Sequence, residues 1–111
     1  MRVICPATTL RDGESGVRFT VERQGLELPA FVIRHQGRVH AYLNRCAHVP
    51  TELDWTPGEF FDADRRYLIC GTHGALYAPD TGRCVGGRCH GRGLVAVAVE
   101  ERDGFVYLVE S

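Results

Sequence analysis

Residues 28–43 read LPAFVIRHQGRVHAYL, and this stretch decides the fold class. Leu28–His35 is an apolar run rich in β-branched residues, and Arg38–Leu43 alternates between polar and apolar side chains. Gln36 and Gly37 lie between the two runs, where a β-hairpin has its two-residue turn. The stretch therefore predicts two antiparallel strands joined by a tight turn.

The rest of the chain repeats this pattern of short apolar runs between glycine and proline residues. Further strands are predicted at Val17–Glu22, Arg66–Cys70, Ala75–Tyr77, Leu94–Glu100 and Phe105–Glu110. Asp103–Gly104 is a second hairpin signal, between the last two strands. The best helical candidate is one turn near Thr51–Thr56, because no stretch keeps a 3.6-residue period. We therefore predict an all-β fold, an antiparallel β-sandwich or partly closed barrel.

The bulk composition limits the possible functions. The chain has 111 residues and a net charge of −1, with 44% hydrophobic and 24% charged residues, as expected for a single globular domain, residues 1–111. Nucleic-acid-binding domains usually carry a strong basic excess, which is missing here. No apolar run approaches the about 18 residues of a membrane span, and no signal peptide is evident. We therefore expect a cytoplasmic protein that binds neither nucleic acid nor membrane.

Two loops interrupt the strand pattern, and each begins with a cysteine that a histidine closely follows. The first loop contains Cys46 and His48, and the second contains Cys70, His73 and Gly74. Iron–sulfur clusters need thiolate ligands, and in the Rieske variant two histidines replace two cysteines on one iron. Two such loops can clamp a [2Fe–2S] cluster from opposite sides. The alternative is a mononuclear zinc site with the same ligands, although the first spacing is poor for a zinc finger.

With these motifs the sequence resembles the Rieske ferredoxin family over most of its length. The resemblance is carried by Arg45–His48, Leu68–Tyr77, Asp80–Gly86 and the last hairpin. It implies a β-rich base with a small inserted cluster-binding subdomain, here about residues 44–93. It also implies one [2Fe–2S] cluster per chain. The implied ligands are Cys46 and Cys70 on the buried iron, and His48 and His73 on the outer iron.

The chain departs from the respiratory members of that family around the implied cluster. Those members carry an extra cysteine in each ligand loop, where this chain has Thr51 and Thr72, so their disulfide across the cluster is missing. Ala75 stands where they have a serine that donates to a cluster sulfur, whereas Tyr77 matches their tyrosine that donates to a cysteine sulfur. Fewer donors stabilise the reduced cluster less. We therefore expect a potential toward the lower part of the Rieske range of about −150 to +300 mV.

The resemblance and the length of the chain together indicate a one-electron carrier rather than an enzyme. The chain would accept electrons from a reductase and deliver them to an oxygenase or another terminal enzyme, so its partners would be redox proteins. The alternative is a small iron–sulfur subunit of a multi-component reductase, similar to the small subunit of assimilatory nitrite reductase. A redox or iron sensor is a third alternative, which no DNA-binding motif supports.

The remaining cysteines have simpler interpretations than a second metal site. Cys84, Cys89 and His90 have the spacing C-x4-C-H, which could bind a metal. We expect instead that Cys84 packs as a small apolar residue near the cluster and that Cys89 lies in a loop. A disulfide between them is expected only under oxidation. Cys5 is expected to be a plain thiol.

Other histidines and aromatic residues are expected to serve structure. His35 should end a strand and His40 should lie within one, both solvent-facing or hydrogen-bonded rather than bound to metal. Most of the group Trp55, Phe60 and Phe61 should form the core of the small subdomain, with docking of a partner as the alternative.

Overall fold

The structure, a computed structural model, describes residues 1–46, 51–72, 74–89 and 91–109, and these form β-strands and two short 3₁₀ turns. The strands are β1 (Arg2–Pro6), β2 (Val17–Arg23), β3 (Leu26–His35), β4 (Arg38–Leu43), β5 (Leu68–Ile69), β6 (Leu76–Tyr77), β7 (Cys84–Gly86), β8 (Ala96–Val97), β9 (Val99–Arg102) and β10 (Phe105–Leu108). The 3₁₀ turns are η1 (Ala7–Thr9) and η2 (Gly87–Cys89). The all-β prediction is therefore confirmed. Among these residues, no helix has the length and apolar character needed to cross a membrane.

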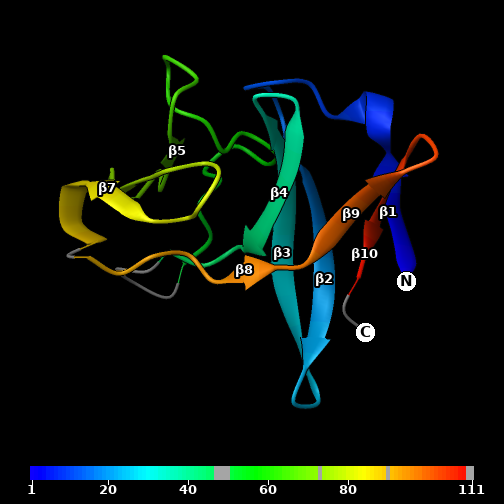
Figure 1. Ribbon diagram of the computed structural model, residues 1–111. Coiled ribbons are helices and arrows are strands. Elements are labelled where there is room, and N and C mark those ends of the chain that lie inside the picture. Colours follow the sequence, from blue (N-terminus) through cyan, green and yellow to red (C-terminus); the bar gives the residue numbers. More distant parts are fainter. Residues whose placement is uncertain (47–50, 73, 90, 110–111) are drawn as a thin grey trace.

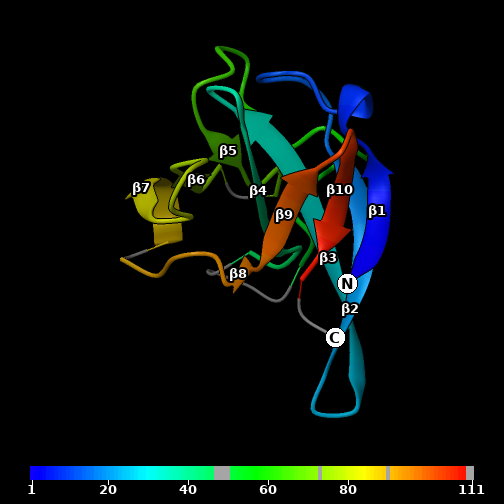
Figure 2. The ribbon, with the colours of Figure 1, turned by 45° about the vertical axis from the view of Figure 1, so that its right-hand side comes forward.

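The strands form three antiparallel sheets. The first has the order β1-β10-β9, the second β2-β3-β4-β8 and the third β5-β6-β7. In both ribbon views (Figures 1 and 2), the small third sheet lies on one side of the second sheet, and β1 and β10 lie on the other. The second sheet is therefore the middle of the molecule.

The buried side chains form two cores, one on each side of the second sheet. The base core consists of Cys5, Ala7, Leu10, Val21, Ala30, Val32, Ala41, Val97, Val106 and Leu108. The site core consists of Phe31, Ile33, Tyr42, Cys46, Leu53, Phe60, Leu68, Cys70, Ala75, Tyr77, Cys89 and Leu94. The second sheet contributes side chains to both cores.

Strand β3 is buried on both faces, which explains its continuous apolar run. Successive side chains of a strand point to opposite faces. Ala30 and Val32 accordingly enter the base core, whereas Phe31 and Ile33 enter the site core. All four are fully buried. A strand with a core on each face needs apolar residues at every position rather than at alternate ones.

Tight turns connect the hairpins as the sequence predicts. Gln36–Gly37 has φ values of 51° and 81°, and Asp103–Gly104 has values of 53° and 84°. Positive φ at both central residues is the geometry of the hairpin turn whose twist matches that of its strands. Gln24–Gly25, with φ values of 52° and 77°, makes a third such turn between β2 and β3 that the sequence analysis did not predict.

Two predictions about single elements are wrong, and two strands were not predicted. The single strand expected at Leu94–Glu100 is divided, because the chain leaves the second sheet after Val97 and enters the first sheet at Val99. The helical turn expected near Thr51–Thr56 is an irregular loop. Strands β1 and β7 were not predicted at all, although β1 pairs with β10 along its length.

Arg34 of β3 ties the first sheet to the second. Its Nε donates to the carbonyl of Leu10 at 2.8 Å, and its two terminal nitrogens donate to the two carboxylate oxygens of Glu101 at 2.8 and 3.0 Å. The hydrogen bond from Arg34 lowers the pKa of Glu101, and the bond to Glu101 raises the pKa of Arg34. Paired Arg–carboxylate bonds are among the stronger hydrogen bonds in proteins.

Replacing Glu101 by glutamine is therefore expected to lower the free energy of unfolding by about 1 kcal/mol at neutral pH, a value reduced for the exposure of the carboxylate. The pKa of Glu101 is lowered in the folded state, so its stabilisation is present above the ordinary value of 4.5 and is lost as the pH falls through the folded value. The difference in the free energy of unfolding between wild type and Glu101→Gln should thus shrink as the pH falls below 4.5.

Urea unfolding at several pH values measures this difference, with the variant Glu27→Gln, at an exposed residue, as the control. A difference that persists undiminished at about pH 3, well below the ordinary carboxylate pKa, would contradict the assignment.

Candidate metal centre

Cys46 lies three residues after the end of β4 and is 3% exposed. Its backbone N–H donates to the carbonyl of Thr51 at 2.7 Å, which closes the first loop over its own base. Its Sγ lies 3.5 Å from the hydroxyl oxygen of Tyr77, within hydrogen-bond distance for sulfur. The first loop therefore holds its cysteine inward, in the site core. His48, the other predicted ligand of this loop, lies outside the described residues.

Cys70 directly follows β5 and is fully buried. Its backbone N–H donates to the carbonyl of Ala75 at 2.9 Å, and the N–H of Gly74 donates to the carbonyl of Cys70 at 2.8 Å. Gly74 has a φ of 70°, which favours glycine, whereas a Cβ there would have open space. The second loop is thus a tight turn that begins at its cysteine. His73 lies outside the described residues.

The two ligand loops contact each other. The N–H of Gly71 donates to the carbonyl of Leu53 at 2.9 Å, and a Cβ on Gly71 would lie 2.7 Å from the Cβ of Trp55. Glycine is therefore required next to Cys70 if the loops are to come this close. Both cysteines belong to the site core, and their assignment as the two sulfur ligands stays a prediction.

Trp55 is the one member of the group Trp55, Phe60 and Phe61 that lies outside the core. Its side chain is 77% exposed, because its Cβ lies against Gly71 while its ring extends into solvent. Phe60 is fully buried and Phe61 is partly buried against the site core, as expected.

A buried polar network that no sequence motif predicts fixes the base of the first loop. Asn44 donates through Nδ2 to Oδ1 of Asp54 at 2.9 Å, and its own Oδ1 accepts from the N–H of Leu53 at 2.9 Å. The other carboxylate oxygen of Asp54 accepts from the N–H of Gly58 at 3.0 Å and lies 3.4 Å from Nε of Arg18. No spacing in the sequence indicates this network, since its members bond across an irregular loop.

Tyr77 confirms what the family resemblance implied for its hydroxyl. The side chain is fully buried on β6, and its hydroxyl is the polar group beside the sulfur of Cys46. Ala75 is also fully buried and offers no hydroxyl. The sulfur of a bound thiolate would therefore accept a hydrogen bond from Tyr77, and the serine donor of the respiratory proteins has no counterpart at Ala75.

The loop between β6 and β7 is held against β4. Tyr42 donates its hydroxyl to the carbonyl of Pro79 at 2.8 Å, and burial raises the pKa of Tyr42, so this donor stays protonated. Gly82 has a φ of 74°, and a Cβ there would lie 2.6 Å from the ring of Tyr42. Glycine is therefore required at the Thr81–Gly82 turn both for its positive φ and because a side chain there would clash with Tyr42.

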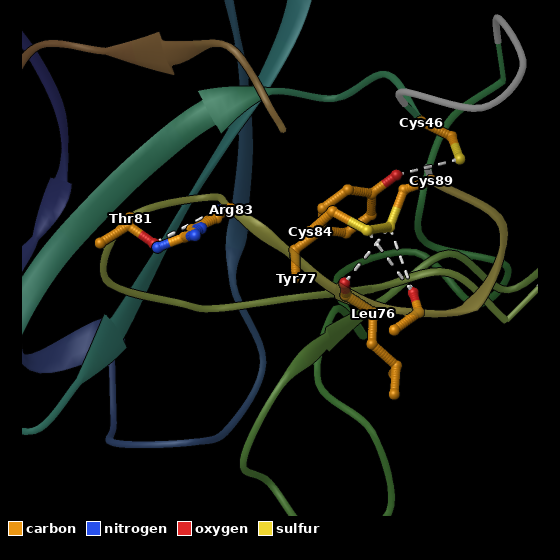
Figure 3. The surroundings of a disulfide bond; sticks show 8 residues. Cys46, Leu76, Tyr77, Thr81, Arg83, Cys84 and Cys89 are labelled. Carbon is orange, nitrogen blue, oxygen red and sulfur yellow. Dashed lines mark hydrogen bonds between the residues drawn. A yellow bond between two sulfur atoms is a disulfide. The ribbon is translucent and has the colours of Figure 1, made fainter. Parts of the chain in front are cut away.

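Cys84 and Cys89 form a disulfide, in contrast to the expected packed thiols (Figure 3). Cys89 is fully buried in η2 and belongs to the site core, so it is not a simple loop residue. Cys84 packs against that core, as expected. A disulfide sulfur is not a thiolate, so the bonded pair does not provide the ligands of a second metal site. His90 lies outside the described residues.

The other described histidines have structural surroundings. His35 ends β3, and its ring stacks on that of Phe61 at a centroid distance of 6.5 Å. His40 lies within β4, and burial lowers its pKa, which favours the neutral ring. Within the described ranges, no three His, Cys, Asp or Glu side chains could together hold a metal ion. Two of the four predicted ligands lie outside those ranges, so the complete ligand set stays a prediction.

The donor set that is described fits an iron–sulfur cluster. Cys46 and Cys70 bring sulfur from two adjoining loops into one apolar core, with the Tyr77 hydroxyl beside one sulfur. Thiolates supplied by two loops in this way are the ligands that such clusters need. Their potentials respond to the hydrogen bonds on sulfur and to solvent exposure.

Solved structures similar to this chain share its fold. The ferredoxin of Sphingomonas yanoikuyae B1 aligns with a TM-score of 0.69 and 22% identity, over 97% of this chain and 95% of that one. The ferredoxin of carbazole 1,9a-dioxygenase from Nocardioides aromaticivorans IC177 aligns with a TM-score of 0.72 and 21% identity, over 100% and 97%. A chain in a complex of oxygenase and ferredoxin in carbazole 1,9a-dioxygenase aligns with a TM-score of 0.72 and 24% identity, over 96% of this chain and 89% of that one.

Sequence comparison gives the family directly. Among curated protein sequences, none matches this chain. The family model described as the Rieske [2Fe-2S] domain, in contrast, matches residues 1–101, nearly the whole chain. Together with two buried cysteines on adjoining loops, this match shows that the chain belongs to the Rieske [2Fe–2S] domain family.

Proposed function

We propose that this chain is a one-electron carrier that passes electrons from a reductase to an oxygenase, and that it is not itself an enzyme. One [2Fe–2S] cluster would be held by Cys46, His48, Cys70 and His73, within a cluster-binding part of about residues 44–93. The observation that carries this proposal is the meeting of Cys46 and Cys70 in one buried core beside the Tyr77 hydroxyl.

The similar structures support the electron-carrier role. Several are ferredoxins, and one is a complex of oxygenase and ferredoxin in carbazole 1,9a-dioxygenase. This chain covers 89–97% of the matched chains in these three structures. We expect the protein in the cytoplasm, and cell fractionation tests that location.

Voltammetry and purification from the native cells test the proposal. We expect a reversible one-electron couple for each chain, and a protein that purifies apart from any large partner. A loaded protein without such a couple would contradict the carrier role. Copurification at a fixed ratio with a large siroheme protein would instead support the reductase-subunit alternative.

Replacing Tyr77 by phenylalanine is expected to lower the midpoint potential of the cluster by a few tens of mV, on the order of 1 kcal/mol for one electron. The hydroxyl lies 3.5 Å from the sulfur of Cys46, and a donor to that sulfur stabilises the more negative, reduced cluster. The matched control is Tyr107→Phe, a partly buried tyrosine of β10 in the first sheet. An unchanged potential in Tyr77→Phe would show that the hydroxyl does not act on the cluster.

A further inference from the structure

The segment closed by the disulfide between Cys84 and Cys89 is connected to both ligand loops of the candidate metal centre. Cys84 is paired with Tyr77 across β6 and β7, and the hydroxyl of Tyr77 touches the sulfur of Cys46. The register of this ladder shifts between Leu76 and Tyr77, beside the residue paired with Cys84. A change at Cys84 therefore reaches the first ligand loop through a single side chain.

The segment that carries the disulfide also packs on the second ligand loop. Gly87 opens η2 with a φ of 77°, and a Cβ there would lie 2.7 Å from the Cα of Ala75 and 2.8 Å from the carbonyl of Gly74. Cys89, two residues later, is fully buried in the site core. The disulfide thus closes the segment from β7 to η2, which packs at Gly87 on the turn that begins at Cys70.

The surroundings of the sulfurs suit the reduced pair as well as the oxidised one. The Sγ of Cys89 lies 3.1 Å from the carbonyl oxygen of Gly86 and 3.7 Å from that of Leu76, and the Sγ of Cys84 lies 3.8 Å from the carbonyl oxygen of Gly86. A disulfide sulfur has no proton to donate to these carbonyls, whereas each thiol could donate its S–H. Reduction would therefore leave no buried sulfur without an acceptor.

The length of the closed loop and its exposure also favour reduction. The sequence separation of the two cysteines is 5, and a short loop gains the least stabilisation from closure. Cys84 is partly exposed whereas Cys89 is fully buried, so Cys84 is the residue of the pair that an incoming thiolate would attack. Thiol–disulfide exchange depends on such access to one sulfur of the bond.

From these observations we propose that Cys84–Cys89 is a thiol–disulfide exchange site, opened by a dithiol reductant of the thioredoxin class, whose state adjusts the potential and retention of the cluster. A reductant thiolate forms a bond to the Cys84 sulfur, and the Cys89 sulfur leaves as a thiolate. The second thiol of the reductant then releases Cys84, so two electrons and two protons pass to the pair and the reductant becomes a disulfide. The exchange stands on this chain's cysteines alone, whereas its effect on the cluster rests on the proposed function.

The exchange is tested on the loaded protein with reduced thioredoxin and its NADPH-dependent reductase. Free thiols are labelled with a maleimide of known mass and located by mass spectrometry. We expect partly exposed Cys84 to become labelled in the folded, thioredoxin-treated protein, whereas buried Cys5 and Cys89 are labelled only after unfolding. After unfolding without further reductant, Cys89 should be labelled in the thioredoxin-treated sample and not in the untreated one. If Cys84 and Cys89 stayed unlabelled in both steps, the pair would be a purely structural disulfide and the proposal would be overturned.

The effect on the cluster is tested on the same samples by its midpoint potential and by the rate at which iron is lost to a chelator. We expect the midpoint potentials of the thioredoxin-reduced wild type and of the double variant Cys84→Ser, Cys89→Ser to shift in the same direction from that of the disulfide form. Both should also lose iron about threefold to tenfold faster than the disulfide form. Equal potentials and equal rates in both states would overturn the adjusting role. A colourless protein that still exchanges its disulfide would instead contradict the proposed function.

Discussion

Replacement of Cys70 by alanine is expected to remove the iron from the protein, from about two atoms per chain to almost none, because a [2Fe–2S] cluster cannot be retained without its thiolates. Cys70 is fully buried, and its loop is closed on both sides by backbone hydrogen bonds. In the disulfide form of the protein Cys84 and Cys89 are bonded to each other and Cys5 lies in the base core, so none of the three takes the place of Cys70. Iron analysis and the visible spectrum measure the loss.

The matched control for this change is Cys5→Ala. Cys5 is also a buried cysteine, 7% exposed, but it packs on the far side of the second sheet from the candidate metal centre. This variant should keep its full iron content and colour. If Cys70→Ala also kept them, the assignment of Cys70 as a ligand would be wrong.

Replacement of Phe31 by alanine is expected to lower the free energy of unfolding by about 3–5 kcal/mol, the usual cost of emptying a buried aromatic site. Phe31 is fully buried, and its ring stacks on that of Phe60 at a centroid distance of 3.9 Å and an interplanar angle of 10°. The carbonyl of Phe60 accepts from the N–H of Ile69, next to Cys70. The cavity would therefore separate the second sheet from the segment that carries Cys70, and iron loss should also be faster.

Chemical denaturation of Phe31→Ala measures this effect, with Phe105→Ala as the control. Phe105 is 43% exposed on β10, so its removal should cost about 1 kcal/mol or less. Similar losses for the two variants would show that the stacked rings do not join the sheet to the site.

The sequence predicts those parts of the structure that depend on neighbouring residues. The β3–β4 hairpin and its Gln36–Gly37 turn follow from a local run of residues and one local geometry. The cysteines of the two ligand loops are predicted because their spacing to a histidine is distinctive, and Cys46 and Cys70 do meet in one core. The hydroxyl of Tyr77 follows from the family resemblance rather than from any local pattern.

The features that the sequence does not predict depend on partners far along the chain. Strand β1 forms because β10 lies beside it, about a hundred residues away, and five residues alone give too weak a pattern. Trp55 is apolar, yet it is 77% exposed, and no pattern in the sequence predicts that. The bond between Asn44 and Asp54 joins two ordinary loop residues, which become a network only once the loop is folded.

Pulsed EPR of the dithionite-reduced protein tests the central assignment most directly. With Cys46 and Cys70 on one iron and His48 and His73 on the other, we expect one unpaired electron per chain, coupled strongly to two imidazole nitrogens. Replacement of either histidine should remove one of these couplings or the whole signal. A reduced cluster with no coupling to nitrogen, or a protein that stays free of iron when produced with ample iron and sulfide, would contradict the account.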